Sequence, residues 1–399
     1  MLDANPFLGR VLTGRIHSGT VKVNTPIKAL NRDGEVVETG RISKLLSFRD
    51  LERVPVDEAG AGDLVAIAGL TKATVADTLC DISVTEPLYA TPIDPPTLAM
   101  TFSVNDSPLA GTEGSKVTSR VIRDRLLREA EGNVAIRITE TDAKDAFDVA
   151  GRGELQLGVL IETMRREGFE LSISRPRVLF RDDPETGKTM EPIEEAVIDV
   201  DEEYSGVVVE SMSNRKAEMQ EMLPAGGGKV RITFLAPSRG LIGYHGQFLT
   251  ETRGTGIMNR VFHSYAPTKG PIDGRRNGVL ISNSPGKTVA YSLWNLEERG
   301  TMFVGSGAKA YAGMIIGENA RPGDLEVNPM KAKQLTNIRA SGTDENIRLT
   351  PPRKMSLEQA LAYIGSDELV EVTPETIRLR KYHLDPHERK RASRAESAA

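Results

Sequence analysis

Residues 151–178, GRGELQLGVLIETMRREGFELSISRPRV, carry the pattern that decides the fold. Apolar residues first recur every three to four positions, as on one face of a helix, and then alternate, as on one face of a strand. The helical set is Leu157, Leu160, Ile161 and Met164, and the alternating set is Phe169, Leu171 and Ile173. Gly168 stands between the two sets, where a helix commonly ends in a left-handed cap. The stretch predicts a helix that leads into a strand, each with one apolar side.

The same pattern returns in residues 238–262, SRGLIGYHGQFLTETRGTGIMNRVF, with Gly254 in the capping position, 86 residues after Gly168. A helix and a strand with one apolar side each cannot stand alone, so each copy is half of a small α/β sandwich. Strand and helix signals upstream complete a β-α-β-β-α-β order in both copies. The sequence therefore predicts two ferredoxin-like domains in tandem, over residues 97–181 and 192–267, joined by the polar linker 182–192.

The segments on either side read as mainly β. Residues 7–30 hold short alternating runs broken by glycine, which predicts a small β-barrel over residues 1–92. Residues 268–385 predict a mainly β C-terminal domain, with a strand at 289–294 among others and one helix at 356–364. The charged tail, 386–399, is expected to be disordered. The predicted fold class is a multidomain β and α+β protein.

Composition limits the compartment and the kinds of partner that this chain can have. Only one cysteine, Cys80, occurs in 399 residues, so no internal disulfide framework exists, and no apolar run reaches membrane-spanning length. The start of the chain has no secretory signal, which favours the cytoplasm. Residues 266–399 carry 20 basic and 16 acidic side chains, whereas residues 1–265 carry 31 and 40. This contrast predicts a polyanionic partner for the C-terminal third.

The main candidate site is the stretch 328–343, NPMKAKQLTNIRASGT, which holds three cations, no acid and few large apolar residues. A long loop that is poor in core residues is usually functional or disordered. Its cations can neutralise RNA phosphates, although a solvated basic loop gives the same composition. Arg275 and Arg276 form a second cationic turn with the same two readings. His383 and His387 lack a third ligand and are interrupted by Pro386, so no metal site is expected.

Four stretches resemble known families. Residues 9–23, GRVLTGRIHSGTVKV, resemble the β-barrel second domain of translational GTPases. The order of a barrel and two ferredoxin-like domains resembles elongation factor G. The stretches AGRGELQLGVLIETMRREGFEL, APSRGLIGYHGQFLTETRGTGIMNRVF and LTNIRASGTDE resemble the TypA/BipA family of ribosome-associated translational GTPases.

That resemblance implies a monomeric, cytoplasmic protein that binds the ribosome, through ribosomal RNA and A-site transfer RNA, without a membrane. It also implies a role in translation, ribosome assembly or stress response. The residues implied in RNA contact are Lys331, Lys333, Gln334, Asn337, Arg339 and Ser341, together with Arg275 and Arg276 of the cationic turn. A different class stays open, since tandem ferredoxin-like domains also occur in proteins that sense small molecules.

The GTPase domain of the family is not expected in this chain. A P-loop needs Gly-x-x-x-x-Gly-Lys-Ser/Thr, so that backbone N–H groups and the lysine hold a phosphate. Gly187-Lys188-Thr189 has Asp182 where the first glycine belongs, and Gly286-Lys287-Thr288 has Ile281 there. We therefore expect no enzymatic activity, no cofactor and no metal in this chain, with GTP and Mg²⁺ implied only for a full-length protein. The chain is expected to be a fragment or the product of a split reading frame.

Overall fold

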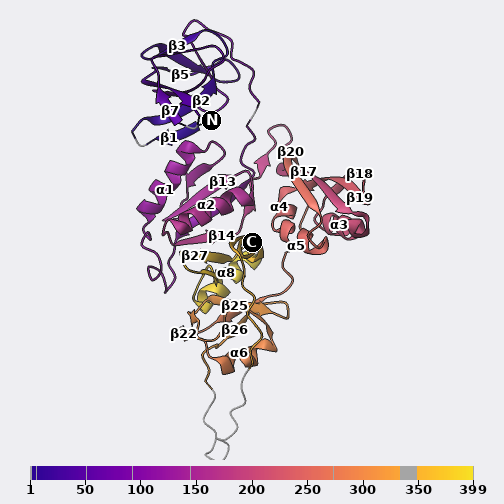
Figure 1. The fold of residues 1–399 in the computed structure, drawn as a ribbon. Coiled ribbons are helices and arrows are strands. Elements are labelled where there is room, and N and C mark those ends of the chain that lie inside the picture. Colours follow the sequence, from indigo (N-terminus) through magenta and orange to yellow (C-terminus); the bar gives the residue numbers. More distant parts are fainter. Residues whose placement is uncertain are drawn as a thin grey trace, which may run out of the picture. The chain divides into compact units, whose positions relative to one another are not determined.

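The computed structural model describes residues 2–5, 7–50, 52–91, 93–143, 145–272, 274–332 and 348–398. The chain folds into two compact units (Figure 1). Unit 1 comprises Met1–Pro96, Arg120–Thr139 and Ala150–Arg152. Unit 2 comprises Thr97–Ser119, Glu140–Val149 and Gly153–Ala399.

Unit 1 is mainly β. Its first ten strands are β1 (Leu2–Asn5), β2 (Gly9–Arg15), β3 (Thr20–Lys22), β4 (Pro26–Leu30), β5 (Val36–Arg41), β6 (Lys44–Arg49), β7 (Glu52–Pro55), β8 (Glu58–Gly60), β9 (Leu64–Ala68) and β10 (Thr78–Cys80). They form sheets in the orders β1-β2-β9-β6-β7, β10-β4-β5 and β3-β8. Helix α1 (Ser119–Gly132) and strand β12 (Arg137–Glu140) lie almost wholly in this unit.

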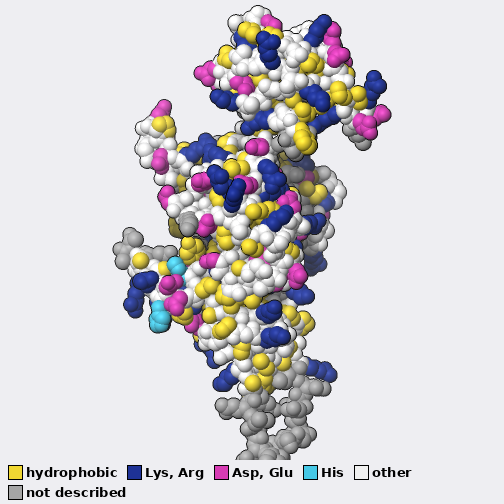
Figure 2. Space-filling model, turned by 90° about the vertical axis from the view of Figure 1, so that its left-hand side faces the viewer, with side chains coloured by type: hydrophobic (Ala, Val, Ile, Leu, Met, Phe, Trp, Pro, Cys, Tyr) yellow, Lys and Arg dark blue, Asp and Glu magenta, His cyan; other side chains and the backbone are white. Residues whose placement is uncertain are grey.

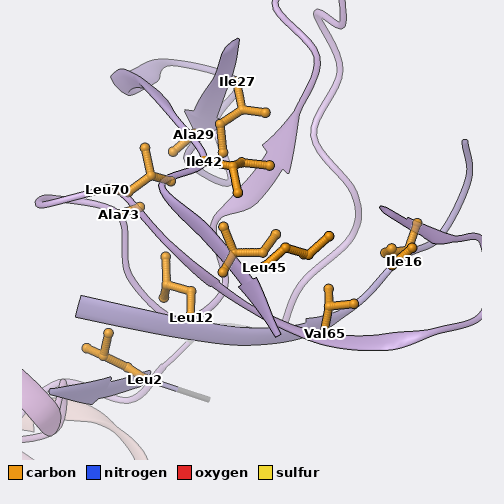
Figure 3. Close-up of a cluster of buried hydrophobic side chains, with 12 residues drawn as sticks. Leu2, Leu12, Ile16, Ile27, Ala29, Ile42, Leu45, Val65, Leu70 and Ala73 are labelled. Atoms are coloured by element: carbon orange, nitrogen blue, oxygen red, sulfur yellow. The ribbon is translucent and has the colours of Figure 1, made fainter. Parts of the chain in front are cut away.

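A cluster of aliphatic side chains from these sheets forms the core of unit 1 (Figure 3). Leu12 of β2, Ile27 of β4, Leu45 of β6 and Val65 of β9 all belong to it, and Leu45 is fully buried. The alternation read in the sequence thus directs one side of each strand inward. Cys80 on β10 is half-buried, and burial raises the pKa of its thiol.

Glu38 of β5 joins two parts of unit 1 that are far apart in sequence. Its carboxylate accepts the N–H groups of Ala73 at 2.6 Å, Lys72 at 2.6 Å and Thr71 at 3.1 Å. Burial raises the pKa of Glu38, but these donors together outweigh it and hold the pKa below its ordinary value.

This site predicts an acid sensitivity. A lowered pKa contributes stability above the unfolded-state value of about 4.3, and that stability is lost as the pH falls through the folded-state value. We expect Glu38→Gln to cost about 1 kcal/mol at pH 7 and to reduce the difference in melting temperature between pH 7 and pH 3.5. Thermal unfolding at both pH values measures this. An unchanged pH dependence would show that the carboxylate charge is not what holds residues 71–73.

Unit 2 is built on one large sheet, which contains the first copy of the repeated pattern and the C-terminal part of the chain. Along the sheet the strands run β13-β11-β14-β27-β28-β25-β21-β26, with β15 on β11 and β23 on β25. Their bounds are β11 (Leu98–Val104), β13 (Ala146–Gly151), β14 (Leu171–Ser174), β15 (Arg177–Val178), β21 (Val279–Ser282), β23 (Gly300–Met302), β25 (Met314–Asn319), β26 (Leu325–Val327), β27 (Glu368–Val372) and β28 (Ile377–Lys381). β14 pairs antiparallel with β27, with Ile173 opposite Val370 (Figure 1).

The stretch that decided the fold forms helix α2 (Glu154–Arg166), then β14. Leu157, Leu160, Ile161 and Met164 are all buried, and Gly168 has a φ of 90°. The left-handed cap expected after the helix is thus present, because only glycine adopts this conformation without strain.

The second copy of the pattern forms its own antiparallel sheet, in the order β20-β17-β19-β18, with β16 on β17. The elements are β16 (Arg181–Asp182), β17 (Thr189–Asp201), α3 (Glu202–Asn214), β18 (Glu218–Gly226), β19 (Lys229–Pro237), α4 (Ser238–Leu241), α5 (Tyr244–Glu251) and β20 (Ile257–Pro267). One face packs on the helices, with Ile198, Ile232 and Phe248 fully buried. Gly254, with a φ of 80°, follows α5 as expected.

The predicted linker 182–192 is shorter than expected, because strand β17 begins at Thr189. Residues 183–188 make a hairpin turn between β16 and β17, in which the Gly187 N–H donates to the carbonyl of Asp183 at 2.8 Å. Glu191 is fully buried, forms an ion pair with Arg239 and accepts the Lys269 N–H at 2.7 Å. A polar composition suggested a linker here because the partners of the buried Glu191 lie about fifty to eighty residues away in sequence.

The strand predicted at 289–294 is wrong, since helix α6 (Ala290–Glu297) occupies it. Val289, Tyr291 and Leu293 alternate, but the side chains that reach the core are Leu293 and Leu296, which are a helical turn apart. The preceding strand β22 (Gly286–Lys287) pairs with β24 (Lys309–Ala310) as a separate ribbon.

Two helices follow residue 348. Helix α7 (Leu357–Tyr363) was expected, and Ser356 caps it through a capping box with Gln359. The tail was expected to be disordered but forms helix α8 (Pro386–Ala398). Asp385 explains its start, because its carboxylate accepts the N–H groups of His387 at 2.7 Å and Glu388 at 3.1 Å. None of the described helices is both long and apolar enough to cross a membrane.

Candidate nucleic-acid interface

Asn328, at the start of the basic stretch 328–343, and Thr350, beyond its end, both bond to helix α6. On the incoming side, the Ser292 hydroxyl donates to the carbonyl of Asn328 at 2.6 Å. On the outgoing side, the Thr350 N–H donates to the Glu297 carboxylate at 2.6 Å. Residues 328 and 350 are therefore both attached to α6, one near each end of this helix.

Lys331 is the one predicted loop contact that lies in the described residues. Its side chain is exposed, and no described carboxylate forms an ion pair with it. The turn before it is held by Asn328, whose side-chain oxygen accepts the Met330 N–H at 2.9 Å. Figure 2 shows Lys and Arg side chains in dark blue beside this part of the chain. The other loop candidates, Lys333, Gln334, Asn337, Arg339 and Ser341, lie outside the described residues.

The cationic turn separates into two different environments. Arg275 donates to both carboxylate oxygens of Glu368, at 2.8 and 2.9 Å, and its guanidinium lies 4.6 Å from the ring centroid of Tyr363. Burial works to lower the pKa of Arg275, but Glu368 outweighs it, so the pKa lies above its ordinary value. Arg276, by contrast, is exposed. Arg275 therefore holds the fold together, and only Arg276 offers a free charge at this turn.

Two further cations were not recognised from the sequence as candidates. Lys287 and Lys309 are exposed and lie opposite each other across the ribbon of β22 and β24. Lys287 was considered only as part of an incomplete P-loop. The available signal was the low acidic content of residues 283–317, in which Glu297 and Glu298 are the only acidic residues.

Comparison with known proteins first defines the class. Residues 9–80 match the family described as "Elongation factor Tu domain 2", and residues 188–276 match "Elongation factor G C-terminus". Mixed β and α+β segments in this order define an elongation factor-like protein of the translational GTPase class.

Residues 277–386 match "TypA/BipA C-terminal domain". The chain is 49% identical over 99% of its length to a protein of Escherichia coli K12 named "Large ribosomal subunit assembly factor BipA", and covers 65% of that protein. Proteins with the same name from Haemophilus influenzae and Synechocystis are 49% and 48% identical over 100% and 95% of the chain, which covers 64% and 63% of them. The chain belongs to the TypA/BipA family, and it spans about 65% of the length of the E. coli relative.

Among solved structures, one from Thermus thermophilus aligns with a TM-score of 0.43 at 14% identity, over 67% of this chain and 55% of that one. This likeness is too slight to support an argument.

The family corrects one expectation. No enzymatic activity was expected, because neither P-loop-like segment of the chain is complete. That expectation is contradicted by relatives 49% identical over 99% of the chain, since they place it in a family of GTP hydrolases. No described residue is assigned to the nucleotide, because Gly187-Lys188 lies in a hairpin turn and Gly286-Lys287 in a strand, whereas a P-loop leads into a helix.

Proposed function

We propose that this chain binds the ribosome through RNA and acts in assembly of the large ribosomal subunit or in translation. The names of the relatives support the assembly role. The observation that carries the proposal is that Asn328, at the start of the acid-free basic stretch, and Thr350, seven residues after its end, both bond to helix α6, with Lys331 exposed. Cations presented on a loop with fixed ends can reach phosphate groups in a crevice of folded RNA.

The finer architecture belongs to the same proposal. We assign a β-barrel to residues 1–92, ferredoxin-like domains to 97–181 and 192–267, and a C-terminal domain to 268–385. The order β20-β17-β19-β18, with helix α3 after β17 and α5 after β19, supports the second of the ferredoxin-like assignments. We further propose that the chain acts as a monomer. The sensing alternative gains no support from the described residues.

The RNA contacts proposed are Lys331, Lys333, Gln334, Asn337, Arg339 and Ser341, with Arg276 as a separate exposed charge. Their partners would be ribosomal RNA and the transfer RNA in the A site. Arg275 contributes indirectly, because it fixes the turn that carries Arg276.

Changing Lys331, Lys333 and Arg339 together to Ala tests the loop. Each neutralised phosphate contributes about 0.7–0.9 to the slope of log affinity against log salt, so the triple variant should flatten the slope by roughly two to three units. Binding to purified large ribosomal subunits across a salt series measures this slope. Stability should change by less than about 0.5 kcal/mol if the three side chains are free surface cations.

A matched control is Lys188→Ala with Lys216→Ala, because both lysines are exposed and lie outside the C-terminal part. Its slope should equal that of the unchanged chain. If the triple variant keeps the full slope, the loop does not contact RNA phosphates and the proposed site fails.

A further inference from the structure

A two-stranded ribbon places two lysines directly opposite each other. β22 pairs antiparallel with β24, so that Gly286 faces Ala310 and Lys287 faces Lys309. Directly opposite residues point to the same side, with Cβ atoms about 4.5–5.5 Å apart, and like charges in this position destabilise the pairing. Both lysines are exposed, and neither forms an ion pair with a carboxylate of the described residues.

The other side of the ribbon is fixed to the core. Ala310 is 4% exposed and belongs to a hydrophobic cluster against which Met330 packs. A Cβ added at Gly286 would lie 3.2 Å from Cγ of Met330, so the two already approach closely. Thr288, at the end of β22, donates its hydroxyl to the carbonyl of Gly305 at 2.7 Å. These contacts hold the ribbon on the core and keep the two lysines opposite each other.

A third cation, Lys331, follows the residue that packs against the ribbon. Met330, which packs near Gly286, directly precedes the exposed Lys331. Glu297 and Glu298 are the only acidic residues between positions 283 and 317, and neither forms an ion pair with Lys287 or Lys309. A bound polyanion would supply the missing charge and relieve the repulsion between the lysines.

An exposed aromatic side chain lies on the next element. Helix α6 begins three residues after Lys287 and carries Trp294, the one tryptophan of the chain. Trp294 is 50% exposed, and its ring centroid lies 6.5 Å from that of Tyr291. Exposed aromatic rings bind single-stranded nucleic acid by stacking on the bases.

We propose that Lys287, Lys309 and Lys331 bind backbone phosphates of RNA, with the exposed Trp294 of the following helix as a stacking surface for a base. This proposal rests on the proposed function and adds to it a second RNA contact, made by two lysines from outside the loop. RNA is the expected partner, because it offers phosphates that the paired lysines can neutralise and bases that can stack on an exposed ring.

Lys309→Glu tests the ribbon, because it converts a like-charge pair into an opposite-charge pair. We expect the melting temperature to stay the same or rise, while RNA binding weakens and the salt slope falls by at least about 0.7–0.9. The double variant Lys287→Ala with Lys309→Ala should lower the slope by about 1.4–1.8. The full chain is titrated with large ribosomal subunits and with a single-stranded RNA oligonucleotide, the latter followed by Trp294 fluorescence. Lys188→Ala is the control and should change neither measurement.

The outcomes separate the two proposals. If the unchanged chain binds large ribosomal subunits and both ribbon variants keep its slope, the ribbon inference is overturned while the proposed function stands. A fall in melting temperature with an unaltered slope would likewise make the lysines structural. If the unchanged chain binds neither RNA nor ribosomal subunits, both proposals fail. Binding to anionic lipid vesicles alone, lost in the ribbon variants, would assign the ribbon to a membrane surface and overturn RNA as its partner.

Discussion

Replacing Glu368 with Ala should destabilise the C-terminal part of the chain by about 3–5 kcal/mol, because the half-buried Arg275 would lose its carboxylate partner and the buried Lys381 would lose one of its three. The side chain of Glu368 is fully buried and accepts hydrogen bonds from Arg275 at 2.8 and 2.9 Å, from Lys381 at 2.9 Å and from the Gly365 N–H at 2.7 Å. Lys381 is itself only 2% exposed. Denaturant unfolding followed by circular dichroism measures the loss.

The pH dependence of this site has a definite sign. Burial raises the pKa of Glu368, but Arg275 and Lys381 outweigh it and hold the pKa below its ordinary value. The stabilisation is therefore present above the unfolded-state pKa of about 4.3 and is lost as the pH falls through the lowered folded-state value. Glu358→Ala, on the exposed side of α7, is the matched control and should cost less than about 0.5 kcal/mol. A loss of less than about 1 kcal/mol in the free energy of unfolding of Glu368→Ala would mean that Arg275 and Lys381 have sufficient other charge and hydrogen-bond partners.

Replacing Leu160 with Ala should cost about 2–5 kcal/mol, through the lost burial and the cavity left in the core. Leu160 is 4% exposed on α2, beside the fully buried Leu157 and Ile161. The change removes no charge, so the salt slope of RNA binding by the folded fraction should remain unaltered.

Val159→Ala is the control for this helix, because Val159 is the preceding residue and is 59% exposed. It should change stability by less than about 0.5 kcal/mol. Equal costs for the two variants would contradict the assignment of the apolar face of α2. Urea unfolding of both variants, with RNA binding measured at matched folded fractions, makes the comparison.

The parts of the fold that were predictable are those specified by neighbours in sequence. Leu157 and Met164 lie on the buried face of α2 as their spacing indicated, and Gly168 and Gly254 both have positive φ. Helix spacing and capping are local properties, so a single sequence reveals them. Helix α6 was predicted as a strand because the apolar residues of this short segment fit the two-residue period of a strand as well as the period of a helix. Only the packing of Leu296 in the core shows that the segment is a helix.

The parts that could not be predicted depend on partners far along the chain. Ile173 pairs with Val370, and Arg275 pairs with Glu368, with no local signal for either contact. The candidate site likewise contains one part that the sequence predicts and one that depends on distant residues. Composition indicated the basic stretch that contains Lys331, whereas the Lys287–Lys309 pair exists only because β22 and β24 lie side by side.

The pairing of β14 with β27 has a consequence for synthesis of the protein. Ile173 leaves the ribosome almost two hundred residues before its partner Val370, and the whole β16–β20 sheet is made in between. At 5–20 residues per second, the nascent chain carries β14 as an unpaired edge for about 10–40 s. An open apolar edge invites pairing with other chains. A protein of this design therefore depends, while it is being made, on whatever shields that edge near the ribosomal exit.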